Sequence, residues 1–203
     1  MNNTQSAYFI FPVAGLCSGV CSGLSVVVPP LGVFAPGILF GVALTYAINT
    51  SVARLTTGQR AAIIAASSTG FIAAIIAGLL SERLPGFDNG LLYGAIADAI
   101  AGTTGAMVVA GGILFTISSM SLIRTLLFVP VAGALLGVAF GIVGVYISDH
   151  TSLGHPFDDI VSFPLWQAGV ASVIPACQRL SGVDLATEQS GEREPPTTRA
   201  LNS

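Results

Sequence analysis

Charged side chains are scarce in this chain, and lysine is absent altogether. Asp, Glu, Lys and Arg together make up 8% of the 203 residues, whereas a soluble domain carries roughly 25%. So few charges cannot cover a water-soluble surface of this size, which excludes an ordinary soluble domain. The basic residues are all arginines, and the net charge of −3 offers nucleic acid no basic surface to bind.

Catalytic and metal-binding motifs are lacking as well. The three cysteines, an odd number placed in or beside apolar runs, argue against a disulfide framework. Both histidines, His150 and His155, fall in one acidic polar segment, so no Ser or Cys nucleophile has a base to activate it. That segment could bind zinc, and Cys17 with Cys21 could hold a metal, but a solvated loop and buried structural thiols are the simpler interpretations. We therefore expect no enzyme, no metal site and no cofactor.

Long uncharged apolar runs occupy most of the chain, and the mean hydropathy is +0.82. Runs of about 20 residues match a helix that crosses ~30 Å of hydrocarbon at ~1.5 Å per residue. The sequence therefore predicts an all-α fold, a polytopic integral membrane bundle of about six transmembrane helices within residues 1–178, followed by a disordered tail at 179–203. The sixth apolar run is interrupted by Pro164, Gln167 and Pro175, which favours a kinked span and leaves an interfacial segment as the alternative. The predicted spans are 8–28, 31–50, 61–80, 91–117, 125–147 and 160–177.

The positions of the arginines predict the orientation in the lipid bilayer. With both termini in the cytoplasm, Arg54, Arg60, Arg124 and Arg179 all lie on the cytoplasmic side, as the positive-inside rule requires. Of the arginines between the spans, Arg83 then falls outside. We expect a multi-pass protein of the cell membrane with both termini and the tail in the cytoplasm.

A similarity between the two halves of the chain suggests an internal repeat. Residues 37–44, GILFGVAL, resemble residues 133–140, GALLGVAF, and a proline, Pro36 or Pro130, precedes each segment. Two halves of three spans each would have opposite orientations, as in the 3+3 inverted repeats of many transporters. Coincidence in a chain rich in Gly, Ala, Leu and Val is the alternative.

Glycines recur every four residues in several predicted spans. At that spacing they share one face of a helix, and in lipid such small-residue faces let helix backbones approach closely. We expect these ladders to pack helices of the same chain together, and a homo-oligomer interface is the alternative for any one ladder. The glycines concerned are Gly15, Gly19 and Gly23, Gly37 and Gly41, and Gly133, Gly137 and Gly141.

Asp98 is an ionisable residue deep inside a predicted span. A carboxylate near the bilayer centre costs about 2.5–3.5 kcal/mol on insertion scales, so such residues usually face protein and serve a function. Gly94, Gly102 and Gly105 share its helical face, which predicts that Asp98 points toward another helix. Hydroxyl and amide groups of the spans could join it in one polar pocket, or could form ordinary helix–helix hydrogen bonds. The proposed site residues are Asp98, Ser22, Ser25, Ser68, Thr103 and Gln167.

Two functional hypotheses follow from these features, and a third with less support is a membrane enzyme that uses the segment of His150 and His155. The intramembrane acid, the proline-interrupted spans and the suggested repeat favour transport or permeation of a small solute or ion through a pocket at Asp98. The alternative is a non-catalytic scaffold or accessory subunit whose small-residue faces bind partner helices. A transporter requires a water-accessible cavity at Asp98, whereas a scaffold would seal Asp98 with hydrogen bonds.

Overall fold

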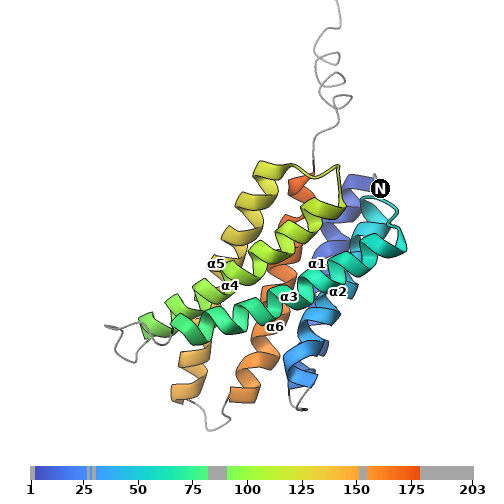
Figure 1. The fold of residues 1–203 in the computed structure, drawn as a ribbon. Helices are drawn as coiled ribbons and strands as arrows, with labels where there is room; N and C mark the ends of the chain where they lie inside the picture. Colours follow the sequence, from blue (N-terminus) through green and yellow to red (C-terminus); the bar gives the residue numbers. More distant parts are fainter. Residues whose placement is uncertain (1–2, 27, 29–30, 82–90, 151–154, 179–203) are drawn as a thin grey trace, which may run out of the picture.

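The computed structural model describes residues 3–26, 28, 31–81, 91–150 and 155–178. Within these ranges the backbone forms six α-helices and one short 3₁₀ helix, with no β-strand (Figure 1). The prediction of an all-helical fold is therefore confirmed for the described residues, and the predicted tail at 179–203 lies outside them. The elements are α1 (Asn3–Val26), α2 (Leu31–Ser51), α3 (Thr57–Ser81), α4 (Leu91–Thr116), α5 (Leu122–His150), α6 (His155–Val173) and η1 (Pro175–Cys177).

Five helices, α1 to α5, contain stretches that are long and apolar enough to cross a membrane, counted over the described part of the chain. The sixth apolar stretch, Val161–Cys177 in α6 and η1, is shorter. Large apolar side chains are exposed on each of the six helices, and Phe115 of α4 is 90% exposed. Such an exterior is compatible with a multi-pass membrane protein, because lipid accepts apolar surface that water would penalise.

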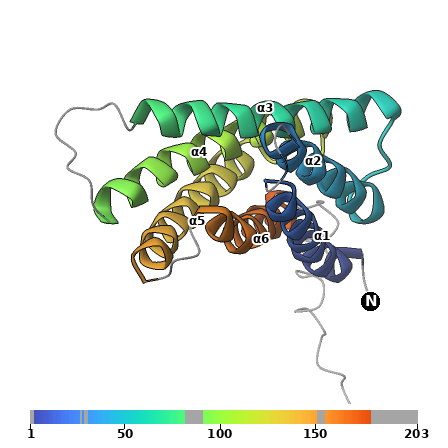
Figure 2. The same ribbon diagram turned by 90° about the horizontal axis from the view of Figure 1, so that it is seen from below.

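The helices form a closed ring in chain order. Each helix packs against the next one along the chain, and α1 packs against α6 to close the ring (Figure 2). Helices α3 and α4 run obliquely to the other four (Figure 1). The ring therefore brings the first and last helices side by side and gives the molecule a common interior.

The start of α3 differs from the predicted span, which began at residue 61, whereas the helix begins at Thr57. The backbone N–H of Thr56 donates to Gln59 Oε1 at 2.9 Å, and the backbone N–H of Gln59 donates to Thr56 Oγ1 at 3.3 Å. This reciprocal pair is a capping box, which satisfies N–H groups that a helix start leaves without partners. Hydropathy missed this first turn because residues 57–60 are mostly polar.

The α5 glycine ladder of Gly133, Gly137 and Gly141 lies against the backbone of α4. A methyl group at Gly137 would collide with the carbonyl oxygen of Asp98, and one at Gly141 would lie 2.7 Å from that of Gly94. Because glycine has no side chain, the two backbones approach to contact along this face. The ladder therefore sets the distance between α4 and α5.

The ladders of α1 and α2 also lie between helices of this chain. The first faces α6, and a methyl group at Gly15 would lie 2.5 Å from the carbonyl oxygen of Gln167. The second faces α3, and a methyl group at Gly41 would lie 2.6 Å from the Cα atom of Ile64. The ladder glycines with such contacts are Gly15, Gly19, Gly37 and Gly41, and Gly23 is buried.

The packing of the matched segments gives the suggested inverted repeat no support. A repeat would pair α2 with α5 and align Gly37 with Gly133. In the structure the α2 ladder contacts α3, the following helix, whereas the α5 ladder contacts α4, the preceding helix. Glycines at matched positions therefore contact helices that the repeat would not make equivalent.

Large apolar side chains fill one end of the ring. The buried cluster comes from the first halves of α1, α3 and α5 and from the middle and second halves of α2, α4 and α6. We call this half the core end, and the opposite half, where α1, α3 and α5 finish, the cavity end. Among the largest fully buried members of the core end are Phe11, Leu44, Ile63, Ile113 and Ile174.

Candidate functional site

A cavity of about 370 Å³ lies in the cavity end, and all six helices contribute to its wall. Many of the residues that line it are the smallest ones available, glycine and alanine. These small side chains let the helices meet but cannot fill the space between them, so the interior stays open at this end. The small lining residues among those described are Gly32, Ala74, Gly78, Ala101, Gly102 and Gly137.

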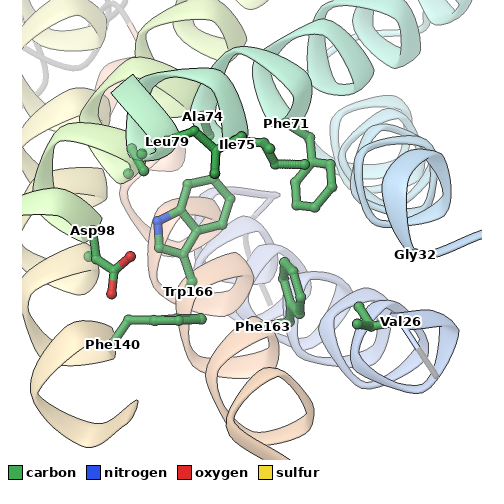
Figure 3. A pocket seen from close by; sticks show the side chains of 14 residues that line it. Val26, Gly32, Phe71, Ala74, Ile75, Leu79, Asp98, Phe140, Phe163 and Trp166 are labelled. Carbon is green, nitrogen blue, oxygen red and sulfur yellow. The ribbon is translucent and has the colours of Figure 1, made fainter. Parts of the chain in front are cut away.

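Asp98 supplies the ionisable side chain among the described lining residues. It is partly buried on α4, and its carboxyl group points toward Trp166 and Phe140 (Figure 3). The α5 glycine ladder fixes this position, because Gly137 brings the backbone of α5 against the carbonyl group of Asp98. The two helices therefore meet at Asp98 with its carboxyl group at the cavity.

Four aromatic side chains line the same cavity: Phe71, Phe140, Phe163 and Trp166 (Figure 3). The ring centroid of Phe163 lies 5.7 Å from that of Phe71 and 6.4 Å from that of Phe140. Favourable aromatic pairs have centroids about 4.5–7 Å apart, so the three phenylalanine rings form one connected surface. The cavity thus combines a carboxyl group with an aromatic wall.

The cavity ends near the middle of the bundle, where Trp166 packs on Phe40 with ring centroids 5.8 Å apart. Beyond this contact lies a gap of about 10 Å³ that Phe71, Ser67 and Gln167 also line. A single water molecule needs ~10–15 Å³ measured this way, so the gap has room for about one. The packed side chains of the core end close the interior behind it.

Gln167 joins three helices by hydrogen bonds at this depth. Ser18 Oγ donates to Gln167 Oε1 at 2.5 Å, and Gln167 Nε2 donates to Ser22 Oγ at 3.0 Å. Nε2 also lies 3.5 Å from the carbonyl oxygen of Pro36. Gln167 is 1% exposed, so a buried amide of this kind requires such partners. We call this group of α1, α2 and α6 residues the Gln167 clamp.

The proposed site residues occupy three kinds of position. Asp98 lines the cavity, whereas Ser22 and Gln167 meet in the clamp. The hydroxyls of the other three donate to carbonyl oxygens three or four residues earlier in their own helices, a common arrangement for Ser and Thr inside a helix. These three are Ser25, Ser68 and Thr103, with hydrogen bonds of 2.6–2.8 Å. Among the described lining residues of the cavity, Asp98 is thus the one that the sequence singled out as a ligand.

The aromatic wall was not predicted from the sequence. Phe163 and Trp166 are three residues apart and share a helical face, which was an available signal. Phe71 and Phe140 come from other helices, and their convergence depends on the ring arrangement. Ser67, a polar residue of the same predicted span as Ser68, is buried, and its hydroxyl has no hydrogen-bond partner within the described structure.

The histidines and cysteines do not form a site among the described residues, where no group of three or more His, Cys, Asp or Glu could hold a metal ion. Cys17 and Cys21, which were expected to be buried, are exposed on α1. The expectation was wrong because the face of α1 that carries Gly15 and Ser18 is the buried one. The side chains of the predicted His/Asp segment lie outside the described residues.

Comparison of the chain with models of protein families, with curated proteins and with solved structures finds no match. Its function is therefore inferred from the residues and their geometry alone.

Proposed function

We propose that the chain is a membrane protein of six spans that binds a small solute or ion in the cavity at Asp98 and moves it across the bilayer. One observation carries this proposal: all six helices build a single cavity of about 370 Å³ with a carboxyl group in its wall. Small-molecule sites usually enclose about 300–1,000 Å³, so the cavity is large enough for a ligand.

The six-span arrangement depends on the apolar stretch Val161–Cys177 of α6 and η1. Its 17 residues match the lower limit of the ~17–25 residues that cross the ~30 Å of hydrocarbon. With α6 spanning, the core end carries Arg54, Arg60 and Arg124 and is the cytoplasmic side under the positive-inside rule. Both termini are then cytoplasmic, and the cavity faces the outside of the cell membrane.

The unequal filling of the two ends supports transport in which access alternates between the two sides. The cavity reaches mid-depth and stops at the contact between Trp166 and Phe40, next to the Gln167 clamp. Passage requires a second conformation in which the core end opens and the cavity end closes. The structure then corresponds to the outward-facing conformation.

The alternative of a scaffold or accessory subunit has less support. Its sequence signal was the set of glycine ladders, which could have bound partner helices. In the structure Gly15, Gly41 and Gly137 contact neighbouring helices of the same chain, so these faces are already occupied. Because these ladders contact helices of the same chain, they give no support to a homo-oligomer.

Thiol accessibility from each side of the membrane tests the proposal. The native cysteines are replaced by alanine, and single cysteines are placed on α4 at Ala101 in the cavity wall, at Val109 in the core end, or at Met107 on the exposed face. A charged, membrane-impermeant thiol reagent is expected to modify Ala101→Cys rapidly from the outside. It should modify Val109→Cys slowly and from the cytoplasmic side, because that residue becomes accessible in the second conformation. Met107→Cys, the matched control, should stay unreactive in lipid.

Each pattern of labelling decides a different part of the proposal. Equal reactivity of Ala101→Cys and Met107→Cys would eliminate the cavity as a site and leave the scaffold alternative. Labelling of Ala101→Cys from outside, with Val109→Cys unreactive from both sides, would preserve a binding site but contradict transport.

A further inference from the structure

We propose that a single water molecule occupies the gap between Ser67 and Gln167 and joins α3 to the Gln167 clamp by hydrogen bonds. This inference goes beyond the proposed function, because it concerns the closed middle of the ring and holds whether or not the chain transports a solute.

Ser67 carries a buried hydroxyl group whose hydrogen-bonding capacity is unused. The residue is 2% exposed, and its Oγ atom has no hydrogen-bond partner within the described structure. Its neighbour Ser68 shows the common arrangement, in which the hydroxyl donates to the carbonyl oxygen of Ile64, four residues earlier, at 2.8 Å. Burial of a hydroxyl without a partner is unfavourable, because the group loses its hydrogen bonds to water on folding. Ser67 therefore requires a partner that is not a group of the described chain.

The gap that Ser67 lines persists because the backbones around it are already in contact. A methyl group at Gly37 of α2 would lie 2.7 Å from the Cα atom of Ser68, and one at Gly41 would lie 3.1 Å from the Cβ atom of Ser67. Gly105 of α4 lines the gap as well. Helices α2 and α3 therefore cannot move together to fill it. The apolar side chains that line the gap are those of Phe40, Phe71, Val109 and Trp166.

Gln167 and Pro36 bring further polar groups to the same gap. The Nε2 atom of Gln167 carries two N–H groups, and the bond to Ser22 Oγ at 3.0 Å uses one of them. The carbonyl oxygen of Pro36 lies 3.5 Å from Nε2, beyond the ~2.7–3.2 Å of a good N–H···O bond. The Oε1 atom of Gln167 accepts from Ser18 and has a second lone pair. With the hydroxyl of Ser67, these groups supply the ~2–4 partners that a buried water requires.

The size of the gap selects water among small ligands. Its volume of about 10 Å³ is at the lower limit of the ~10–15 Å³ that one water molecule needs, and a larger ligand has no room. An ion of the same size would lose its hydration without compensation, because none of the described lining residues of the gap is charged.

The position of the gap gives this water a structural role. Helix α3 packs against α2 and α4, whereas α6 packs against α5 and α1, so α3 and α6 are opposite members of the ring (Figure 2). A water bonded to both Ser67 and Gln167 therefore spans the interior. The clamp then joins four helices, α1, α2, α3 and α6, at the depth where the cavity stops.

Solid-state NMR of the isotopically labelled full-length protein in lipid bilayers detects the water directly. Magnetisation is transferred from water protons to the protein, so groups beside a water molecule give the earliest signals. We expect an early signal from Ser67 Cβ, although this residue is buried and is not among the described lining residues of the large cavity. Thr45 Cβ is the matched control, because Thr45 is buried, donates within its own helix to the carbonyl oxygen of Gly41, and does not line the gap. Its signal should rise late.

Unfolding equilibria of variants test the bridge to Gln167. Ser67→Ala is expected to raise the equilibrium constant of unfolding about threefold, the effect of an average interhelical hydrogen bond in a membrane protein. In a Gln167→Leu background the water has lost its partner on α6, so the same substitution should no longer raise the constant. Ser68→Ala is the matched control on α3, because its hydroxyl is bonded within the helix. It should have the same effect in both backgrounds.

Three results would overturn the inference. A Ser67 Cβ signal that rises as late as that of Thr45 would show that no water lies in the gap. A lower unfolding constant for Ser67→Ala would show a dry gap, because removal of an unpartnered hydroxyl relieves an unfavourable burial. Equal effects of Ser67→Ala in the two backgrounds would show that no bridge joins Ser67 to Gln167. The labelling of Ala101→Cys does not depend on this water, so the proposed function can survive each of these results.

Discussion

Both ends of the Gln167 amide have hydrogen-bond partners on other helices, and the Asp98 residue lines the cavity. The two side chains were grouped together in the sequence because each is polar inside an apolar run. Their surroundings give them different roles: Gln167 holds three helices together, and Asp98 is positioned to meet a ligand. The hydroxyls of Ser18 and Ser22 are the hydrogen-bond partners through which Gln167 holds α1 against α6.

At this scale we predict a modest loss of stability for Gln167→Leu. The unfolding free energy should fall by about 1 kcal/mol, because interhelical hydrogen bonds in membrane proteins contribute little on average. The loss stays small because Ser18 and Ser22 retain acceptors in their own helix, the carbonyl oxygens of Gly15 at 3.0 Å and Ser18 at 2.7 Å. Reversible unfolding in detergent or bicelles measures the change.

The matched control for this change is Ser25→Ala, which removes a hydrogen bond within α1, from Ser25 Oγ to the carbonyl oxygen of Ser22. Its unfolding free energy should stay within about 0.5 kcal/mol of the wild type. Equal stabilities of Gln167→Leu and Ser25→Ala would show that the clamp does not hold the three helices together.

At the scale of the helices, the effect of a glycine on stability depends on what lies against it. Gly137 of α5 lies against the carbonyl group of Asp98, whereas a methyl group at Gly111 of α4 would meet nothing within 4 Å. The same substitution should therefore have opposite effects at the two sites. Gly111→Ala is expected to stabilise the protein by about 0.5–1 kcal/mol, because alanine favours a helix over glycine. Gly137→Ala should destabilise it by about 1–3 kcal/mol through overpacking.

Unfolding free energies of the two variants, measured under one set of conditions, check this prediction. A change of the same sign and size in both proteins would mean that α4 and α5 do not approach each other through the α5 ladder.

The sequence predicted the helices well where length and hydropathy decide the structure. The predicted spans 31–50 and 91–117 differ from α2 and α4 by one residue at most. The first turn of α3 was not predicted from hydropathy. It is fixed by the hydrogen bonds of the Thr56 and Gln59 capping box, which hydropathy does not detect. The suggested repeat was inferred from the similar sequences of residues 37–44 and 133–140. Sequence similarity of that kind does not determine which neighbouring helix a glycine ladder contacts.

At the scale of the whole molecule, the ring has an end filled by large side chains and an end left open by small ones. This difference follows from the sequence, in which Phe11, Leu44, Ile113 and their neighbours fall at one depth and glycines and alanines at the other. The depth of each residue was predictable from the spans. The convergence of Phe71, Phe140 and Phe163 was not, because it depends on how helices distant in the chain are arranged.

The central claim, that the cavity at Asp98 takes its ligand from the aqueous phase, requires water to reach Trp166 in the cavity wall. Quenching of Trp166 fluorescence in proteoliposomes tests this claim without any substitution, because the chain has one tryptophan. Acrylamide in the aqueous phase is expected to quench Trp166 efficiently, and lipids brominated in their acyl chains are expected to quench it weakly. Strong quenching by brominated lipids with little effect of acrylamide would place the indole in lipid and contradict the account.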